Sequence, residues 1–133
     1  MTGEIVRVVY IPGALWPVNS WSTDNIHELF SINERVLVEI QTERGLVGVM
    51  FVGATNVGQI ILSFDPEIRG NQLLSQAIVE KSYARLPIQK GEELGQFRMG
   101  STIVMLYSKD TLPKDLQVEK FLNQQVRVNS SFA

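Results

Sequence analysis

The chain has 133 residues, 44% of them apolar, and a formal net charge of −2 at pH 7. These values fit a single domain with its own core and argue against a nucleic-acid binder, which usually carries a basic patch or stripe. There is no cysteine and only one histidine, His27, so disulfides, thiol catalysis, cysteine-based metal sites and multi-histidine metal sites are excluded, and we expect no metal. We also expect no signal peptide and no spanning helix, because no segment reaches the roughly 20 apolar residues that a bilayer requires.

Short β-branched or alternating stretches, separated by turns with glycine and proline, predict a mainly β protein. In chain order, the expected strands are residues 4–11, 35–42, 46–54, 57–64 and 101–107. The second and third of these form a hairpin around a turn at residues 43–45. Residues 73–83 fit either a short helix or a poor strand, and residues 125–129 are one further candidate strand.

One short helix is expected between the first two strands, at residues 22–30. Ser22 or Thr23 is its candidate N-cap, and acidic residues occupy its first turn. A loop that contains Trp16 and Trp21 precedes it. Many short strands with one or two short helices indicate a β fold with minor α content, arranged as a sandwich or flattened barrel. No repeat or linker divides the chain, so residues 1–133 are expected to form one domain.

The tripeptide Gly100-Ser101-Thr102 stands directly before the apolar run of the last expected strand. A polar entry into a strand explains it without chemistry, because such short motifs are common. Alternatively, the Ser101 hydroxyl attacks the Gly100 carbonyl, where no side chain blocks the approach. The acyl group would then move from nitrogen to oxygen. Elimination and hydrolysis would release ammonia and leave a pyruvoyl group, an electrophilic ketone that no standard side chain supplies.

Four motifs follow one another over residues 4–107. They are Pro-Gly-x-Leu-x-x-Val-Asn at residues 12–19, Leu-Phe-x-x-Asn-Glu-Arg-Val at residues 29–36, Val-Gly-Ala-x-x-Val-Gly-x-Ile at residues 52–60, and the stretch from Pro87 to Val104. In type and order they resemble the motifs of phosphatidylserine decarboxylases, and the last one resembles that family's processing site. On fold, the resemblance is to barrel-sandwich hybrids.

This resemblance implies a self-cleaving proenzyme, cut between Gly100 and Ser101. Residues 1–100 would become the β chain and residues 101–133 the α chain, headed by a pyruvoyl group made from Ser101, and the two would stay associated. The substrate would be phosphatidylserine, and the products phosphatidylethanolamine and carbon dioxide. The substrate amine would form a Schiff base with the ketone, which accepts the electrons of the leaving carboxylate before a positioned acid returns a proton.

The resemblance also implies a substrate pocket, for which the candidate residues are Val18, Asn19, Gly53, Ala54 and Thr102. It implies peripheral contact with a membrane surface, mainly through an N-terminal region of the family that this sequence lacks, and no nucleic-acid partner. The expected location is the cytoplasmic face of the bacterial inner membrane, with the mitochondrial inner membrane as the alternative. Whether the protein forms a homodimer stays open.

The chain departs from the family at the base that activates the serine. The family combines the serine with a histidine and an aspartate, and both lie upstream of the segment where this sequence begins. His27 does not match that histidine and is expected on a helix surface. We therefore expect a truncated piece of a longer enzyme that leaves Ser101 uncut, because a serine hydroxyl without a base is a weak nucleophile. A wrongly started gene and a reduced homologue are the alternatives.

Other functions explain the sequence less completely. The Gly91-Glu92-x-Leu94 turn is similar to that of biotinyl and lipoyl carriers, but these need a lysine flanked by Met or Asp at a hairpin tip, so the likeness concerns the fold alone. A non-catalytic remnant stays open, and the flanking motifs speak against a pyruvoyl decarboxylase of free amino acids. For the segment from Asn33 to Arg35, a structural salt bridge or cap is favoured over a substrate contact. A lipid-facing Trp16 is a further hypothesis.

Overall fold

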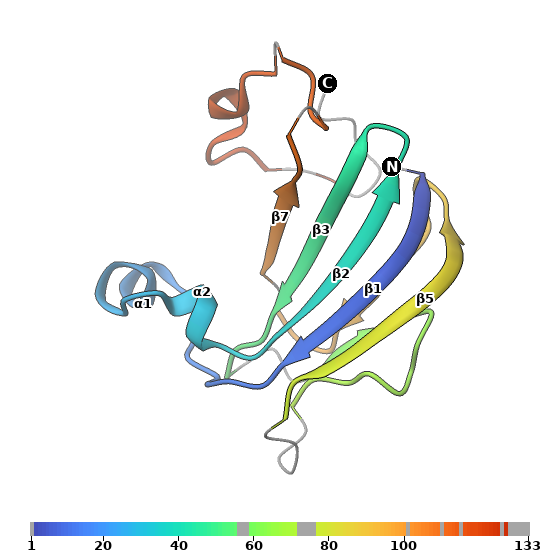
Figure 1. Ribbon diagram of the computed structural model, residues 1–133. Coiled ribbons are helices and arrows are strands. Elements are labelled where there is room, and N and C mark those ends of the chain that lie inside the picture. The colour runs from blue at the N-terminus through green and yellow to red at the C-terminus, as the bar shows by residue number, and fades with distance from the viewer. Residues whose placement is uncertain are drawn as a thin grey trace.

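The computed structural model describes residues 2–55, 59–71, 77–100, 102–109, 111–114, 116–125 and 127. Its main feature is a five-stranded antiparallel sheet in the order β5-β1-β2-β3-β7. These strands are β1 (Gly3–Ile11), β2 (Arg35–Thr42), β3 (Gly45–Val52), β5 (Val79–Ile88) and β7 (Ile103–Tyr107). A two-stranded sheet pairs β4 (Ile60–Leu62) with β6 (Gly95–Phe97). Figure 1 shows the large sheet as a curved layer with β5 and β7 at its two edges.

The prediction of a mainly β fold is confirmed, and the described strands form two facing sheets without closing into a barrel. Of the strand expected at residues 57–64, residues 57 and 58 lie outside the described part, and among residues 59–64 only Ile60–Leu62 forms the strand β4. The ambiguous stretch at residues 73–83 leads into β5, although residues 72–76 lie outside the described part. Of the candidate strand at residues 125–129, only Gln125 and Arg127 are described, and neither belongs to a strand.

The prediction of one helix at residues 22–30 is wrong. Two short helices are present instead, α1 (Ser20–Asn25) and α2 (Leu29–Ile32), and a 3-10 helix, η1 (Val118–Phe121), follows β7. The helical conformation is interrupted between α1 and α2 because Glu28 takes a left-handed conformation, with φ of 55°. The N-cap of α1 is Asn19 rather than Ser22 or Thr23, since its Oδ1 accepts a hydrogen bond of 2.9 Å from the Ser22 N–H. The first turn of α1 contains no acidic residue.

The core lies between the two sheets, as the alternation in β2 predicts. Val36, Val38 and Ile40 are buried on one face of β2, and their partners across the ladders point the same way. The small sheet covers this face, and the rings of Phe51 and Phe97 meet at 5.4 Å between centroids. The buried core cluster consists of Ile5, Val8, Tyr10, Val36, Val38, Ile40, Phe51, Ile60, Leu62, Ile68 and Ile88.

A buried carboxylate joins the loop after β4 to the edge strand β5. Asp65 accepts hydrogen bonds from the Tyr83 hydroxyl and, at 3.1 Å, from the Glu67 N–H, and it pairs with Lys81 at 2.5 Å. Burial raises the pKa of Asp65, but the bonds from Lys81, Tyr83 and Glu67 outweigh burial and hold this pKa below its usual value. The ionised form is therefore favoured by folding.

Replacing this carboxylate should change how stability depends on pH. The pKa of Asp65 is lower in the folded than in the unfolded chain, so its contribution is complete above the unfolded value of about 3.9 and is lost as the pH falls through the folded value. Asp65→Asn should be less stable than wild type at pH 7, and the difference should shrink on acidification. Urea unfolding between neutral and acid pH tests this, with exposed Asp24→Asn as control. A difference that is independent of pH would contradict it.

Candidate active site

The predicted processing segment lies in an exposed connection between β6 and β7. Gly100 is exposed, with a left-handed φ of 60° that favours glycine, and Ser101 itself lies outside the described residues. On one side, the Arg98 N–H donates to the carbonyl of Gln59 at 3.1 Å. On the other side, the carbonyl of Thr102 accepts from the Val52 N–H at 3.0 Å. The segment is thus anchored on both sides of the Gly100–Ser101 bond.

The sheet brings Thr102 next to the end of β3, where the predicted pocket residues Gly53 and Ala54 follow. Both are buried. The Gly53 N–H donates to the carbonyl of Glu34 at 2.8 Å. A Cβ on Gly53 would lie 3.2 Å from that carbonyl oxygen and 3.3 Å from the Leu15 side chain. This close approach explains why glycine stands there.

Asn33 connects two of the family-like motifs to each other. Its side chain is fully buried and uses both its amide and its carbonyl group. Oδ1 accepts from the Trp16 N–H at 3.1 Å, while Nδ2 donates to the carbonyls of Trp16 and Gly53 at 2.9 and 3.0 Å. Through Asn33, the loop at residues 12–19 is therefore fixed against the segment that follows β3.

Glu34 is a second buried polar residue at the start of β2. Its carboxylate accepts from the Tyr10 hydroxyl at 3.0 Å and from the Asn71 N–H at 2.7 Å. Burial, together with the bond to Glu34, raises the pKa of Tyr10 to about 12. The neighbouring Arg35 donates to the carbonyls of Ser31 and Asn33 at 2.5 and 3.0 Å. The expected structural cap is therefore present at the end of α2.

The remaining pocket candidates lie on the loop before α1. Val18 is half-buried, and Asn19 is exposed and caps α1. The loop reaches the site through earlier residues, since Ala14 pairs with Asn33 and the Thr55 hydroxyl donates to the carbonyl of Leu15. Thr102 bonds to Val52, which precedes Gly53, and Asn33 links Gly53 to Trp16. The substrate contacts of Val18 and Asn19 stay predictions.

His27 lies in the turn between the two helices and not on a helix surface. Its imidazole is 94% exposed and lies 3.6 Å from the carboxylate of its neighbour Glu28. Within the described ranges, no helix is long and apolar enough to cross a membrane, and no three acidic or histidine side chains gather as a metal site would require. In the described part of the chain, therefore, no histidine lies beside the processing segment to act as a base.

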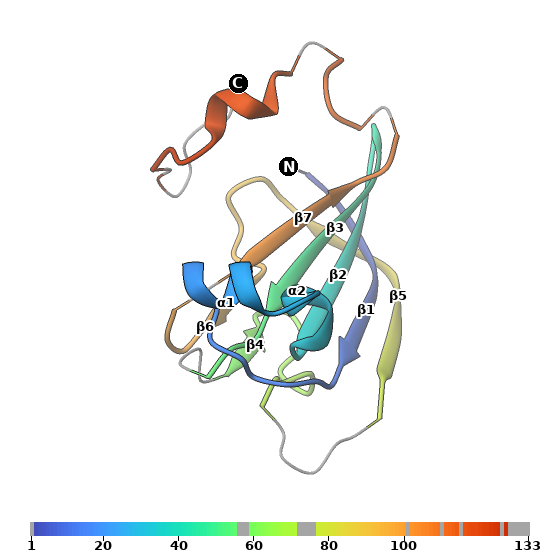
Figure 2. The ribbon, with the colours of Figure 1, turned by 90° about the vertical axis from the view of Figure 1, so that its left-hand side faces the viewer.

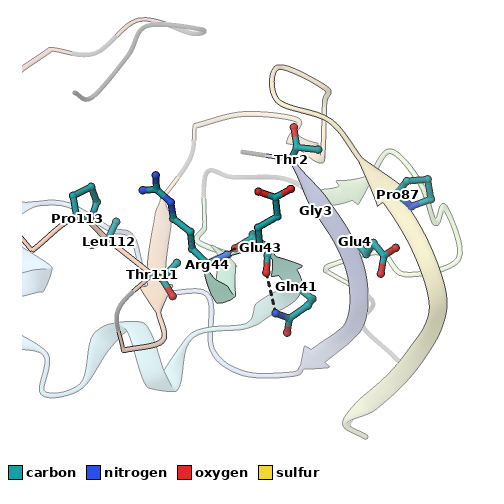
Figure 3. A pocket seen from close by; sticks show the side chains of 11 residues that line it. Thr2, Gly3, Glu4, Gln41, Glu43, Arg44, Pro87, Thr111, Leu112 and Pro113 are labelled. Carbon is teal, nitrogen blue, oxygen red and sulfur yellow. Dashed lines mark hydrogen bonds between the residues drawn. The ribbon is translucent and has the colours of Figure 1, made fainter.

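A pocket of about 760 Å³ lies at the opposite end of the main sheet. Figure 3 shows it between the start of β1, the β2–β3 turn with Glu43 and Arg44, and the segment at Thr111 to Pro113. In the β3–β7 ladder, Val47 pairs with Tyr107 at this end and Phe51 pairs with Ile103 at the other. The pocket is therefore separate from the region of Gly53 and Thr102.

Comparison with known proteins agrees with the sequence motifs. The sequence model of one family, described as phosphatidylserine decarboxylase, matches residues 1–133. Proteins named phosphatidylserine decarboxylase proenzyme are similar to the chain, among them those of Anaeromyxobacter sp. (strain K), 40% identical over 79% of the chain, and Campylobacter jejuni, 40% identical over 86%. The chain belongs to the phosphatidylserine decarboxylase family.

The matches cover only part of the relatives. The chain spans 38% of the Anaeromyxobacter protein, 43% of the Campylobacter protein and 37% of a Myxococcus xanthus relative that is 38% identical to it. About two fifths of a proenzyme's length is thus represented here. Activity, substrate and partners of the whole proteins do not follow from the match alone.

Proposed function

We propose that this chain carries the self-processing serine of a phosphatidylserine decarboxylase, which converts phosphatidylserine to phosphatidylethanolamine and carbon dioxide. The observation that carries this proposal is the meeting of four separate motifs. Thr102 follows the processing position and bonds to Val52, and Asn33 ties the adjacent Gly53 to Trp16. Segments from residues 12–19, 29–36, 52–60 and 87–104 therefore border one site.

The processing step uses the chain's own atoms. The Oγ atom of Ser101 bonds to the carbonyl carbon of Gly100 as the peptide C–N bond breaks, giving an ester. Loss of the Ser101 Cα proton then expels the Gly100 carboxylate and leaves dehydroalanine. One water converts this group to pyruvoyl and releases ammonia. The net change is one water consumed and one ammonia formed, without oxidant or reductant.

The geometry around Gly100 suits such a step. Gly100 is exposed and has a left-handed backbone conformation. As a glycine it has no Cβ that could shield its carbonyl carbon from the attacking hydroxyl. The bond from Val52 to Thr102 holds the chain just after Ser101, so this end does not drift when the bond is cut. The pyruvoyl ketone supplies an electron sink for the loss of carbon dioxide. Gly53, Ala54 and Thr102 form the proposed wall beside it, with Val18 and Asn19 more distant candidates.

The base that activates Ser101 is proposed to come from outside these 133 residues. The single histidine, His27, is exposed and lies in the α1–α2 turn, next to the carboxylate of Glu28. Activation of a serine requires a base within hydrogen-bond reach and an orienting group behind it. The family's histidine and aspartate, which precede the Pro-Gly loop, are the proposed source.

A chimaera tests this proposal. The part of the Campylobacter jejuni proenzyme that precedes the matched region would be fused to residue 1 of this chain. We expect cleavage between Gly100 and Ser101, a smaller piece that is lighter by one ammonia than the hydrolysed peptide, and carbon dioxide release from phosphatidylserine. Ser101→Ala in the same chimaera should stay uncut. A folded chimaera that remains whole would support the alternative of a non-catalytic remnant.

The two proposed chains would be held together by more than the β3–β7 ladder. Beyond β7, Leu46 and Ser108 exchange two bonds of 2.9 Å, from the Leu46 N–H to Ser108 Oγ and from the Ser108 N–H to the Leu46 carbonyl. Ser108 Oγ also lies 2.7 Å from Oγ1 of the buried Thr111. This clasp fastens the segment after β7 to the β2–β3 turn.

Thr111→Val should weaken the clasp without changing side-chain shape. It removes one partly buried hydrogen bond, which lowers the free energy of unfolding by about 1 kcal/mol. Urea unfolding of the uncut chain measures this, with Thr2→Val as the matched control, because the exposed Thr2 hydroxyl accepts only a long bond of 3.3 Å from the Lys90 N–H. Equal stability of both variants would show that the clasp contributes nothing to holding the segment.

A further inference from the structure

The chain makes an excursion between β1 and β2 that consists of residues 14–32 and contains α1 and α2. Figures 1 and 2 show these helices standing out to one side of the main sheet. The excursion exposes Trp16 at 50% and Trp21 at 67%, and the side chains of Phe30 and Ile32 are also exposed. These tryptophans are the only two of the chain. Four exposed large apolar side chains on one projecting segment mark it as a candidate interaction surface.

The apolar side chains are displayed from a fixed backbone. The Trp16 main chain is held on both its N–H and its carbonyl by the buried Asn33. The Ala14 N–H donates to the carbonyl of Ile32 at 2.9 Å, and the Glu34 N–H donates to Ala14 at 2.8 Å. These bonds tie the start of the excursion to its end. Trp16 and Ile32 therefore lie close to the two joined ends of the excursion.

The excursion is continuous with the candidate site. The same Asn33 amide that donates to Trp16 donates to Gly53, whose neighbour Val52 bonds to Thr102. Resting on the proposed function, the substrate is a phospholipid whose acyl chains stay in the bilayer, because each methylene adds to the cost of extraction. A site that acts on such a headgroup has to open at the membrane surface. The apolar surface beside the site is the part that would meet the lipid first.

We propose that residues 14–32 form a bilayer-contact surface, with Trp16 and Trp21 seated at the boundary between headgroups and acyl chains. Tryptophan is enriched at that depth, since its ring is apolar and its indole N–H can still reach water. The ionisable side chains of the excursion are Asp24, His27 and Glu28, and it contains no lysine or arginine, so it carries no basic cluster. Contact is therefore driven by apolar insertion and not by attraction to anionic lipid.

Tryptophan fluorescence of the 133-residue chain reads this contact directly. On addition of phosphatidylcholine vesicles, with or without phosphatidylserine, we expect the emission to shift to shorter wavelength. Lipids brominated in their acyl chains should quench it. Raised salt should leave binding unchanged, because apolar insertion is not screened. Trp16→Ala and Trp21→Ala should each lower the partition coefficient by about tenfold, as loss of one buried aromatic side chain implies.

A matched variant shows whether any exposed apolar side chain, and not only those of the excursion, contributes to vesicle binding. Leu122 lies outside the excursion, directly after η1, and is 69% exposed, much like Trp21, so Leu122→Ala should leave vesicle binding intact. An emission that does not respond to vesicles would overturn the proposal. A shift that rises with protein concentration without lipid would overturn it in favour of a second copy. Binding that falls with salt or with Leu122→Ala would also overturn it.

The outcome is independent of catalysis, since neither cleavage nor decarboxylation enters the measurement. Vesicle binding by a chain whose chimaera fails to process would retain the contact surface and remove the proposed chemistry. A chimaera that is processed while the fluorescence ignores vesicles would retain the chemistry and remove this surface.

Discussion

A single species of 15.0 kDa is the expected result when the purified 133-residue chain is weighed under denaturing conditions. The Gly100–Ser101 bond should remain intact because no histidine lies beside it in the described part of the chain. His27, the one histidine, is 94% exposed in the α1–α2 turn, with its Nε2 3.6 Å from the carboxylate of Glu28. A serine without a base reacts slowly, and removing catalytic triad groups typically costs factors of about 10⁴ or more.

The contrary result would be informative in detail. Two species that divide after Gly100, with the smaller one lighter by one ammonia, would mean that these residues alone form the pyruvoyl group. Ser101→Ala would then have to abolish the cut. A smaller species that retains its full serine mass would instead indicate ordinary hydrolysis in the exposed connection. His27→Ala would show whether the exposed histidine takes part, and we expect it to change nothing.

Asn33→Ala should cause the largest loss of stability among substitutions near the site. It leaves three buried or half-buried main-chain groups without a partner, namely the N–H and carbonyl of Trp16 and the carbonyl of Gly53. We expect the free energy of unfolding to fall by about 3 kcal/mol, since each unsatisfied buried group costs roughly 1–3 kcal/mol and some will reach water. Denaturant unfolding, with the m-value checked for a change of state, measures this.

Asn25→Ala is the matched control, because Asn25 makes one exposed bond, from its Nδ2 to the carbonyl of Trp21 at 2.8 Å. Its loss should cost well under 1 kcal/mol. Asn33→Asp adds a second comparison: it keeps the acceptor for the Trp16 N–H but loses both donors. It should therefore be nearly as harmful as alanine at neutral pH and recover partly when acid protonates the new carboxyl. Equal effects of Asn33→Ala and Asn25→Ala would show that the three hydrogen bonds of the Asn33 side chain do not stabilise the fold.

Strands with a simple alternation could be predicted from the sequence, and those without it could not. Residues 35–42 alternate between core and surface, and β2 has those bounds. The edge strand β5 was ambiguous because most of its side chains are exposed and several are charged, so burial leaves no period in the sequence. The helix prediction failed at Glu28. Its left-handed conformation could not be predicted from the sequence, because such a conformation is uncommon for glutamate.

The candidate site could be predicted as a set of segments but not as a geometry. The motifs marked Gly53, Gly100 and Thr102, and the sheet places Thr102 beside Val52. Asn33 and Glu34 were read as a cap or salt bridge, yet the buried Asn33 bridges to Trp16 and Gly53 and the buried Glu34 to Tyr10. Two polar residues before an apolar strand are a weak hint of burial. Their partners lie 17 to 24 positions away, which only the folded chain reveals.

The place of β7 in the sheet has a consequence for the order of events in the cell. β7 meets the rest of the main sheet only through β3 among the described strands, some fifty residues earlier in the chain. While the chain is whole, the connection keeps β7 at a high effective concentration, and pairing is a unimolecular step. A chain cut before folding would need a bimolecular encounter between two dilute fragments. If the proposed cleavage occurs, folding before the cut avoids this bimolecular step, so we expect the cut to be made in the folded chain.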